Sequence, residues 1–146
     1  MGQKVSPIGF RIGIRENWRS RWYAKKSDYA RYLLEDQKIR KYVKKEYYTS
    51  NIACIEIERT RDKVNVILNT AKPGLIIGKK GSNVEKLNLD LGQYISDKRK
   101  AEVNIKEITN PIVNAQLVSE NIAEQLVKRA NFRRTMKKTM DDAVKQ

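Results

Sequence analysis

Two glycines enclose two lysines at residues 78–81, and this tetrapeptide is the pattern in the chain best suited to bind a phosphate backbone. Gly78 and Gly81 permit a sharp turn and carry no Cβ to hold a sugar-phosphate chain away. Lys79 and Lys80 supply point charges that pair with phosphates. A G-x-x-G string alone is common at helix ends, but here a hairpin pattern precedes it and a helical pattern follows it. We therefore expect these four residues to contact RNA rather than only to link two helices.

A second set of basic residues recurs at a spacing of four near the C-terminus. Arg133 has Lys137 four residues ahead, and Arg134 has Lys138. Like charges at this spacing repel each other within an isolated helix, so a helix that concentrates them is expected to face an anion. A solvated helix face is the competing interpretation. An apolar stripe at the same spacing is formed by Phe132, Met136 and Met140.

The composition favours a polyanionic partner and argues against an enzyme. The 146 residues include 31 Lys and Arg against 17 Asp and Glu, a net charge of +14, which suits a nucleic acid. Histidine is absent and Cys54 is the single cysteine, so a histidine base, a cysteine zinc site and an internal disulfide are excluded. No nucleotide-binding glycine motif occurs, and no carboxylate constellation suggests a nuclease. We expect no catalytic residue, metal or cofactor, and no membrane partner, because no apolar run reaches 18 residues.

Residues 1–27 mix glycine, basic and aromatic residues, which predicts an irregular arm with at most one short strand. In RNA-contacting tails, arginines pair with phosphates and rings stack on bases. For Trp18 and Trp22 we expect burial instead, as anchors of the arm, because large rings are usually well buried. The arm residues expected to contact RNA are Lys4, Arg11, Arg15, Arg19 and Arg21.

Hydrophobic periodicity predicts a helix over residues 28–46, capped by Ser27 or Asp28. Alternating residues at 52–60 and 64–70 predict an antiparallel hairpin joined by a short polar connection. The apolar face of the helix is expected to consist of Tyr29, Leu33, Ile39, Tyr42 and Val43.

A short apolar turn, whose residues Ile76 and Ile77 are expected to line a groove for bases, precedes the glycine-lysine loop. A helix over 82–97 follows, with Ser82 and Glu85 at the spacing of a capping box, and then a strand over 102–108. A further helix is expected to begin at Asn110 and Pro111. The order of helix, hairpin, short helix, glycine loop, helix and strand is the physical logic of a KH domain, which clamps about four nucleotides.

Three longer segments resemble the bacterial-type small-subunit ribosomal protein S-three family, whose members contain a KH domain. They are MGQKVSPIGFRIGI at the start, TAKPGLIIGKKGSNVEKL at residues 70–87 and AQLVSENIAEQLVKRANFRRTMKK at residues 115–138. The resemblance implies an α/β (α+β) fold, a type II KH domain with a three-stranded sheet backed by helices. It implies a basic arm at 1–27, the KH domain at 28–110 and helices at 111–146 that lead into a C-terminal domain, which is shortened here because the chain stops at Gln146.

The resemblance also implies partners and roles. Family members assemble into the head of the small subunit of the cytoplasmic ribosome, where they contact ribosomal RNA, mRNA and neighbouring small-subunit proteins. The positions that match Arg133, Arg134 and Lys137 line the channel by which mRNA enters and assist its unwinding. Ribosome movement drives that unwinding, so no bound ATP is implied. A free-standing KH regulator that reads single-stranded RNA is the alternative, although it leaves the basic arm and the last basic helix unexplained.

Overall fold

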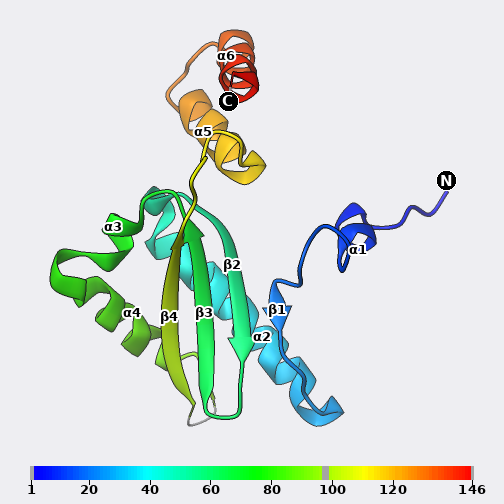
Figure 1. Ribbon diagram of the computed structural model, residues 1–146, viewed down its shortest axis with the longest axis vertical. Coiled ribbons are helices and arrows are strands. Elements are labelled where there is room, and N and C mark those ends of the chain that lie inside the picture. The colour runs from blue at the N-terminus through cyan, green and yellow to red at the C-terminus, as the bar shows by residue number, and fades with distance from the viewer. Residues whose placement is uncertain (1, 97–98, 146) are drawn as a thin grey trace.

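The computed structural model describes residues 2–96 and 99–145, which form a mixed sheet with helices on one face and two helices beyond one end (Figure 1). Its elements are, in chain order, α1 (Pro7–Arg11), β1 (Ser20–Arg21), α2 (Lys26–Glu46), η1 (Tyr48–Ser50), β2 (Ile52–Arg59), β3 (Lys63–Thr70), α3 (Pro73–Ile77), η2 (Lys79–Gly81), α4 (Ser82–Gly92), β4 (Lys100–Glu107), α5 (Ala115–Val127) and α6 (Phe132–Val144). In the described ranges no helix is long and apolar enough to cross a membrane.

The sheet has the strand order β1-β2-β3-β4. Strands β2 and β3 form the expected antiparallel hairpin, with Arg59 opposite Val64, and β3 runs parallel to β4 from Lys63↔Lys100 onward. Parallel neighbours need a crossover connection, which α3, η2 and α4 provide. The predicted fold class is therefore confirmed. Besides the three long strands, the arm adds the two-residue strand β1, parallel to β2.

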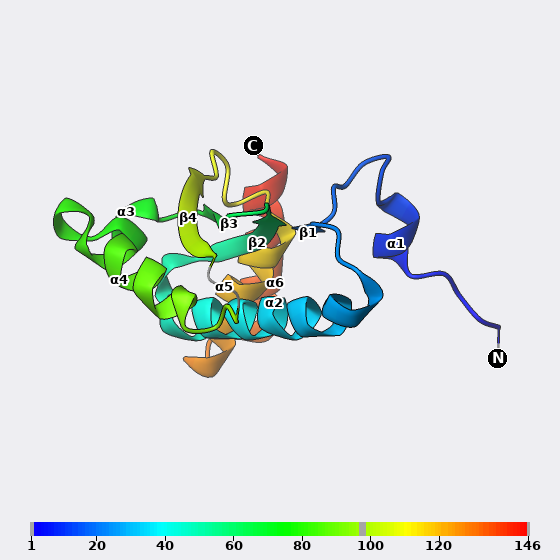
Figure 2. The same ribbon diagram turned by 90° about the horizontal axis from the view of Figure 1, so that it is seen from below.

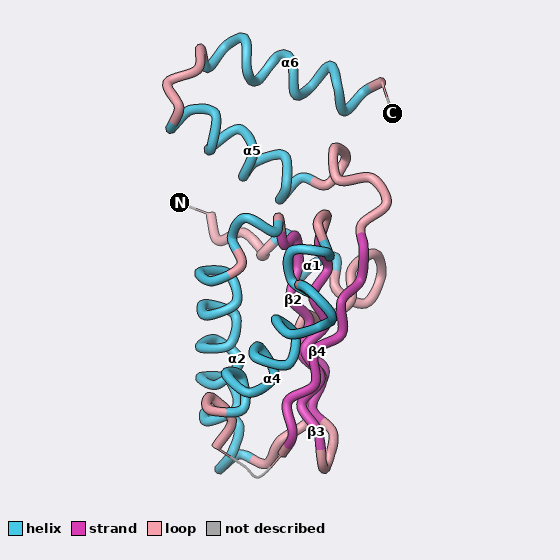
Figure 3. Tube along the Cα trace, turned by 90° about the vertical axis from the view of Figure 1, so that its left-hand side faces the viewer, coloured by secondary structure: helices cyan, strands magenta, loops and turns pink. Residues whose placement is uncertain are grey.

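Helices α2 and α4 cover the same face of the sheet (Figure 3). Strand alternation turns one side chain in two toward these helices, and the helices supply apolar residues at helical spacing. The largest fully buried side chains of this core include Ile39, Val43, Ile57, Val66, Leu68, Leu87 and Leu91. The Tyr42 hydroxyl donates to Asp90 at 2.6 Å and ties α2 to α4, and this hydrogen bond to a carboxylate raises the pKa of Tyr42.

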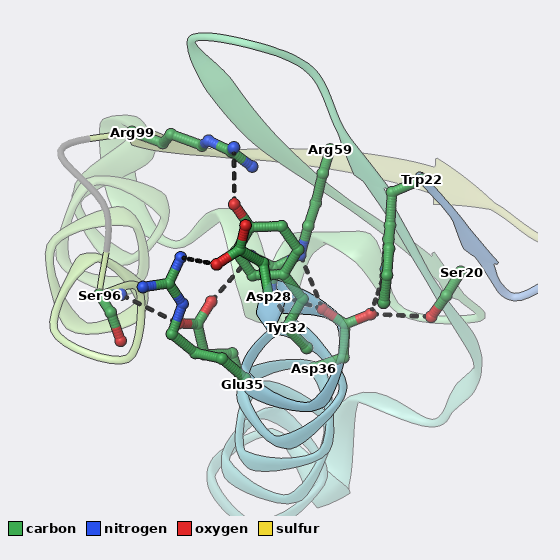
Figure 4. A network of polar contacts seen from close by, with 10 residues as sticks. Ser20, Trp22, Asp28, Tyr32, Glu35, Asp36, Arg59, Ser96 and Arg99 are labelled. Carbon is green, nitrogen blue, oxygen red and sulfur yellow. Dashed lines mark hydrogen bonds and ion pairs between the residues drawn. The ribbon is translucent and has the colours of Figure 1, made fainter. Parts of the chain in front are cut away.

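A buried ion cluster lies between α2 and the end of β2 (Figure 4). Arg59 Nη1 lies 2.8 Å from Glu35 Oε2, and its Nη2 lies 2.6 Å from Asp36 Oδ1; all three side chains are at most 5% exposed. The other oxygen of Asp36 accepts from Trp22 Nε1 at 2.8 Å and from Ser20 Oγ at 2.9 Å. That of Glu35 accepts from the Ser96 N–H at 3.2 Å. Each carboxylate oxygen thus has a donor, as burial of charge requires.

This cluster overturns part of the predicted apolar face of α2. Tyr29 and Leu33 are exposed, whereas Glu35 and Asp36 are buried in their place. A carboxylate is buried only where a cation pairs with it or several groups donate hydrogen bonds to it. In this fold Arg59 is that cation, so the helix turns its acidic pair inward. The prediction was correct for Ile39 and Val43, which are fully buried, and Tyr42 packs at the edge of the core.

Several predicted helix ends were wrong. Helix α2 begins at Lys26, with Lys25 at the N-cap in place of Ser27 or Asp28 and no side-chain cap. The capping box of Ser82 and Glu85 does not form, because Gly81 occupies the N-cap position, and α4 ends at Gly92. The expected helix end at Asp97 lies outside the described residues. Many polar residues can cap a helix, so local pattern alone selects poorly among neighbours.

The last two helices begin at asparagine caps. Helix α5 begins after Asn114, whose side chain accepts from the Gln116 and Leu117 N–H groups, rather than at the predicted Asn110 and Pro111. Residues 111–113 instead form a turn between β4 and α5. The chain therefore changes direction before α5 begins.

Replacing Arg59 by Met should destabilise the chain by about 3–5 kcal/mol, because it leaves two buried carboxylates without their cation. Urea unfolding followed by circular dichroism measures this loss. Arg61→Met is the matched control, since Arg61 is exposed in the hairpin turn and should change stability by no more than about 0.5 kcal/mol. Equal stability of the two variants would contradict a structural role for the cluster.

Candidate nucleic-acid interface

The glycine-lysine loop is held open by two backbone conformations that favour glycine. Gly78 ends α3 with φ 69° and ψ −172°, and Gly81 precedes α4 with φ 84° and ψ 3°. A Cβ on Gly78 would lie 2.5 Å from Asn83 Cγ, which is far inside contact distance. The loop backbone is thus bare at both ends, as a close approach to a sugar-phosphate chain requires.

Charge and apolar surface meet at this loop. Lys79 is exposed, while the Lys80 side chain lies outside the described part of the structure. Helix α4 begins directly after the loop without a side-chain cap, so the partial positive charge of its first N–H groups lies beside Lys79. Leu75 and Ile77 of α3 are exposed next to it. Of the two isoleucines expected to line a groove, Ile76 is fully buried in the core, so only Ile77 is available there.

The predicted basic helix near the C-terminus is present as α6. The Asn131 side chain caps it by accepting from the N–H groups of Arg133 and Arg134. The side chains of Arg133, Arg134, Lys137 and Lys138 are all exposed, and in the described part of the chain none of them is in an ion pair. The guanidinium of Arg133 lies 5.7 Å from the centre of the Phe132 ring. The helix therefore presents four cations to solvent.

Helix α6 lies beyond one end of the sheet with α5, apart from the glycine-lysine loop (Figure 1). Thr135 is its buried residue, and the apolar stripe of Phe132, Met136 and Met140 is exposed. On α5, Lys128 donates to Glu124 at 2.7 Å, which lowers the pKa of Glu124. The structure does not bring the loop and α6 together into one cleft.

The N-terminal arm leaves the body on the side away from α3 and α4 (Figure 2). Its root is fixed: Arg40 donates to the carbonyls of Ile55 and Arg19, and burial lowers the pKa of Arg40. Arg21 Nη2 lies 2.7 Å from a carboxylate oxygen of both Glu56 and Glu58 on β2.

The remaining arm candidates differ from Arg21 in their surroundings. Lys4, Arg11, Arg15 and Arg19 are exposed and make no ion pair among the described residues, although Arg11 donates to the Pro7 carbonyl. The expectation of two buried anchors was correct only in part for Trp22, which is half-buried and donates to Asp36, and was wrong for Trp18, which is 63% exposed. The arm thus presents cations and one indole ring to solvent.

Among the described residues, no group of three or more metal-ligating side chains could hold an ion. The sequence did not predict the buried ion cluster of Arg59 with Glu35 and Asp36. A signal for it existed, because Arg59 continues the inward alternation of Ile55 and Ile57 on β2. Alternation along a strand indicates toward which face of the sheet a side chain points. It does not indicate that a cation on the inner face will be paired with acidic residues of a helix packed there.

The sheet, the crossover and its glycine loop define a KH-domain protein, and residues 38–112 match the KH domain family. The chain is 48% identical over 145 residues to the "Small ribosomal subunit protein uS3" of Pelagibacter ubique, covering 99% of this chain and 63% of that protein. It is 54% identical over 140 residues to that of Oleidesulfovibrio alaskensis, and 52% over 145 residues to that of Nitratidesulfovibrio vulgaris. These two matches cover 96% and 99% of this chain, and 64% and 67% of the relatives.

The chain belongs to the uS3 family, which confirms the resemblance seen in its sequence. It spans about two thirds of the length of the curated relatives that it matches. Those relatives are named as ribosomal proteins and not as enzymes.

Gly78→Ala should destabilise the chain by about 1–3 kcal/mol, because alanine is strained at this backbone conformation and its Cβ meets Asn83. Gly74→Ala is the matched control, since a Cβ there meets nothing within 4 Å and alanine favours the helix α3. We expect the control to lose no stability in urea unfolding. If Gly78→Ala also lost none, the loop would not need the bare backbone described here.

Proposed function

We propose that this chain is an RNA-binding structural component of the small ribosomal subunit. The observation that carries the proposal is the glycine-lysine loop between α3 and α4, in a chain that belongs to the uS3 family and carries a net charge of +14. Its partners are then ribosomal RNA, mRNA and neighbouring small-subunit proteins. The proposed division is an arm at 1–27, a KH domain at 28–110 and helices at 111–146, with its first boundary two residues inside α2 and its second between β4 and α5.

In this proposal the loop clamps a phosphate backbone. Gly78 and Gly81 let the backbone approach, while Lys79 and Lys80 and the start of α4 supply positive charge. The exposed side chain of Ile77 contacts a base beside the clamp. All of these groups act by binding alone, so the chain needs no chemical step and no bound nucleotide.

The arm and α6 provide two further contacts with polyanions. Lys4, Arg11, Arg15 and Arg19 contact ribosomal RNA along the projecting arm, whereas Arg21 is held on the sheet by Glu56 and Glu58. On α6 we assign Arg133, Arg134 and Lys137 to mRNA at the channel by which it enters. Their exposure on one capped helix, without acidic partners in the described ranges, supports this assignment.

Replacing Lys79 and Lys80 together by Gln should weaken binding to single-stranded RNA and reduce its dependence on salt. Each phosphate contact on a single strand adds about 0.7 to the slope of log K against log salt concentration. We therefore expect the slope to fall by about 0.7 for each lysine that contacts a phosphate. A filter-binding titration at several salt concentrations measures both changes.

The control for this experiment removes the same charge elsewhere. Lys63→Gln with Lys128→Gln removes two lysines that are already paired with Glu102 and Glu124, so the slope should not change. If both double variants behaved alike, only net charge would matter and the loop would not be a clamp. Sedimentation with small subunits distinguishes a ribosomal protein from a free-standing KH regulator of single-stranded RNA. A ribosomal protein anchored by its arm keeps co-migrating without the loop lysines, whereas a free regulator never co-migrates.

Reversing charge at Arg133 and Arg134 to Glu should impair translation through structured mRNA and leave translation of unstructured mRNA unchanged. The substitutions remove cations from an exposed helix face, so assembly of the chain into small subunits should persist. In vitro translation of a hairpin-containing message and of its unpaired counterpart measures the difference. Equal rates on both messages would remove these residues from the path of the mRNA.

A further inference from the structure

A cavity of about 680 Å³ lies where the arm meets α2, away from the glycine-lysine loop. It lies within the size range of small-molecule pockets, and its lining is mainly aromatic and apolar. None of the RNA contacts proposed above uses it. The lining residues are Trp18, Ser20, Arg21, Trp22, Tyr29 and Leu33.

One wall of this arm pocket is rigid. Trp22 donates from Nε1 to Asp36 of the buried ion cluster, its ring centre lies 5.5 Å from that of Tyr29, and it meets Tyr32 edge-on at 5.7 Å. Figure 4 shows Trp22 held beside Asp36 and Tyr32. A ring fixed by a buried hydrogen bond keeps its position before any ligand arrives, which reduces the entropy lost on binding.

The rest of the lining is left open to solvent. Trp18 is 63% exposed, Tyr29 is 53% exposed and Leu33 is 51% exposed. Three large apolar side chains around one cavity form a contiguous apolar surface, which is typical of a binding site.

The charge around the arm pocket favours a polyanion over a basic or neutral partner. Within residues 1–27, Glu16 is the single acidic residue among seven basic ones. The acids that contact the lining, Asp36, Glu56 and Glu58, are each already paired with Arg59 or Arg21. Lys25 and Lys26 are exposed at the start of α2, one turn before Tyr29. A nucleotide of a single strand fits both the aromatic lining and the positive charge. Its planar, uncharged base can stack on an indole ring, and its phosphates can pair with the cations.

We propose that the arm pocket binds an unstacked base of single-stranded RNA, stacked on Trp18 against the fixed wall of Trp22. This inference rests on the RNA binding proposed above and adds a base-binding site separate from the KH loop. The arm then binds RNA in two ways: its cations hold phosphates without regard to sequence, and the pocket holds a base. The competing occupant is an apolar side chain of a neighbouring protein.

The test compares two probes on the full 146-residue chain. One is single-stranded oligoadenylate, and the other is an abasic ribose-phosphate oligomer of equal length. Loss of one stacked base weakens binding by about 5- to 150-fold. Trp18→Ala should show that loss for oligoadenylate, no change for the abasic oligomer and an unchanged salt slope. Trp18→Phe, which keeps an aromatic face, should retain most of the affinity.

Tyr23→Ala is the matched control, because Tyr23 is an exposed aromatic of the same arm that does not line the pocket. It should bind both oligomers as the wild type does, and unchanged urea midpoints should confirm that all variants fold. Wild-type affinity of Trp18→Ala for oligoadenylate would overturn the proposal. Wild-type RNA affinity with lost assembly into subunits would assign the pocket to a neighbouring protein and overturn it as well. Failure of the wild-type chain to bind either oligomer would instead overturn the proposed RNA binding.

Discussion

The buried charge of Arg59 constrains much of this structure. A guanidinium that is 2% exposed needs anionic partners, and it has two, Glu35 and Asp36, on the middle of α2. Their second oxygens in turn bind the arm at Ser20 and Trp22 and the segment after α4 at Ser96 (Figure 4). One ion cluster thereby sets the rotation of α2 on the sheet, the path of the arm and the position of Ser96 after α4. Since each of these depends on the same three charges, none can move alone.

The charge of the molecule is distributed unevenly over this frame. On the sheet, Glu56 and Glu58 of β2 are paired with Arg21, and Glu102 of β4 is paired with Lys63. Exposed cations without an ion pair among the described residues are found on the arm, at Lys79 and along α6, and also on α2 and β4, as at Lys38, Lys41, Lys100 and Lys106. Burial of Ile76, Leu87 and Leu91 fixes the crossover that carries the glycine loop, so that loop is exposed on a rigid support. A polyanion thus has at least three separate basic surfaces to contact on this molecule.

Much of the fold followed from local pattern. The hairpin, the third long strand and the start of the helix after the loop were predicted within a few residues, because alternation and helical spacing are short-range signals. The two loop glycines were found for the same reason, since each occupies a backbone conformation that favours glycine. Helix starts were predicted poorly. Asn114 caps α5 although Asn110 with Pro111 is the stronger local signal, and the choice depended on where the chain had to turn after β4.

The sequence by itself therefore determined the order of elements, the glycine loop, the excess of positive charge and the membership of the uS3 family. Only the tertiary structure decided which charges lie inside and which aromatic rings face solvent. Arg59 and Asp36 are 23 residues apart, and each would avoid burial without the other. Trp18 and Trp22 are the same residue type and lie four residues apart in sequence. Trp22 donates a hydrogen bond to Asp36, whereas Trp18 has no such acceptor among the described residues. Burial of polar and aromatic groups depends on partners that only folding brings together, and sequence spacing carries no record of them.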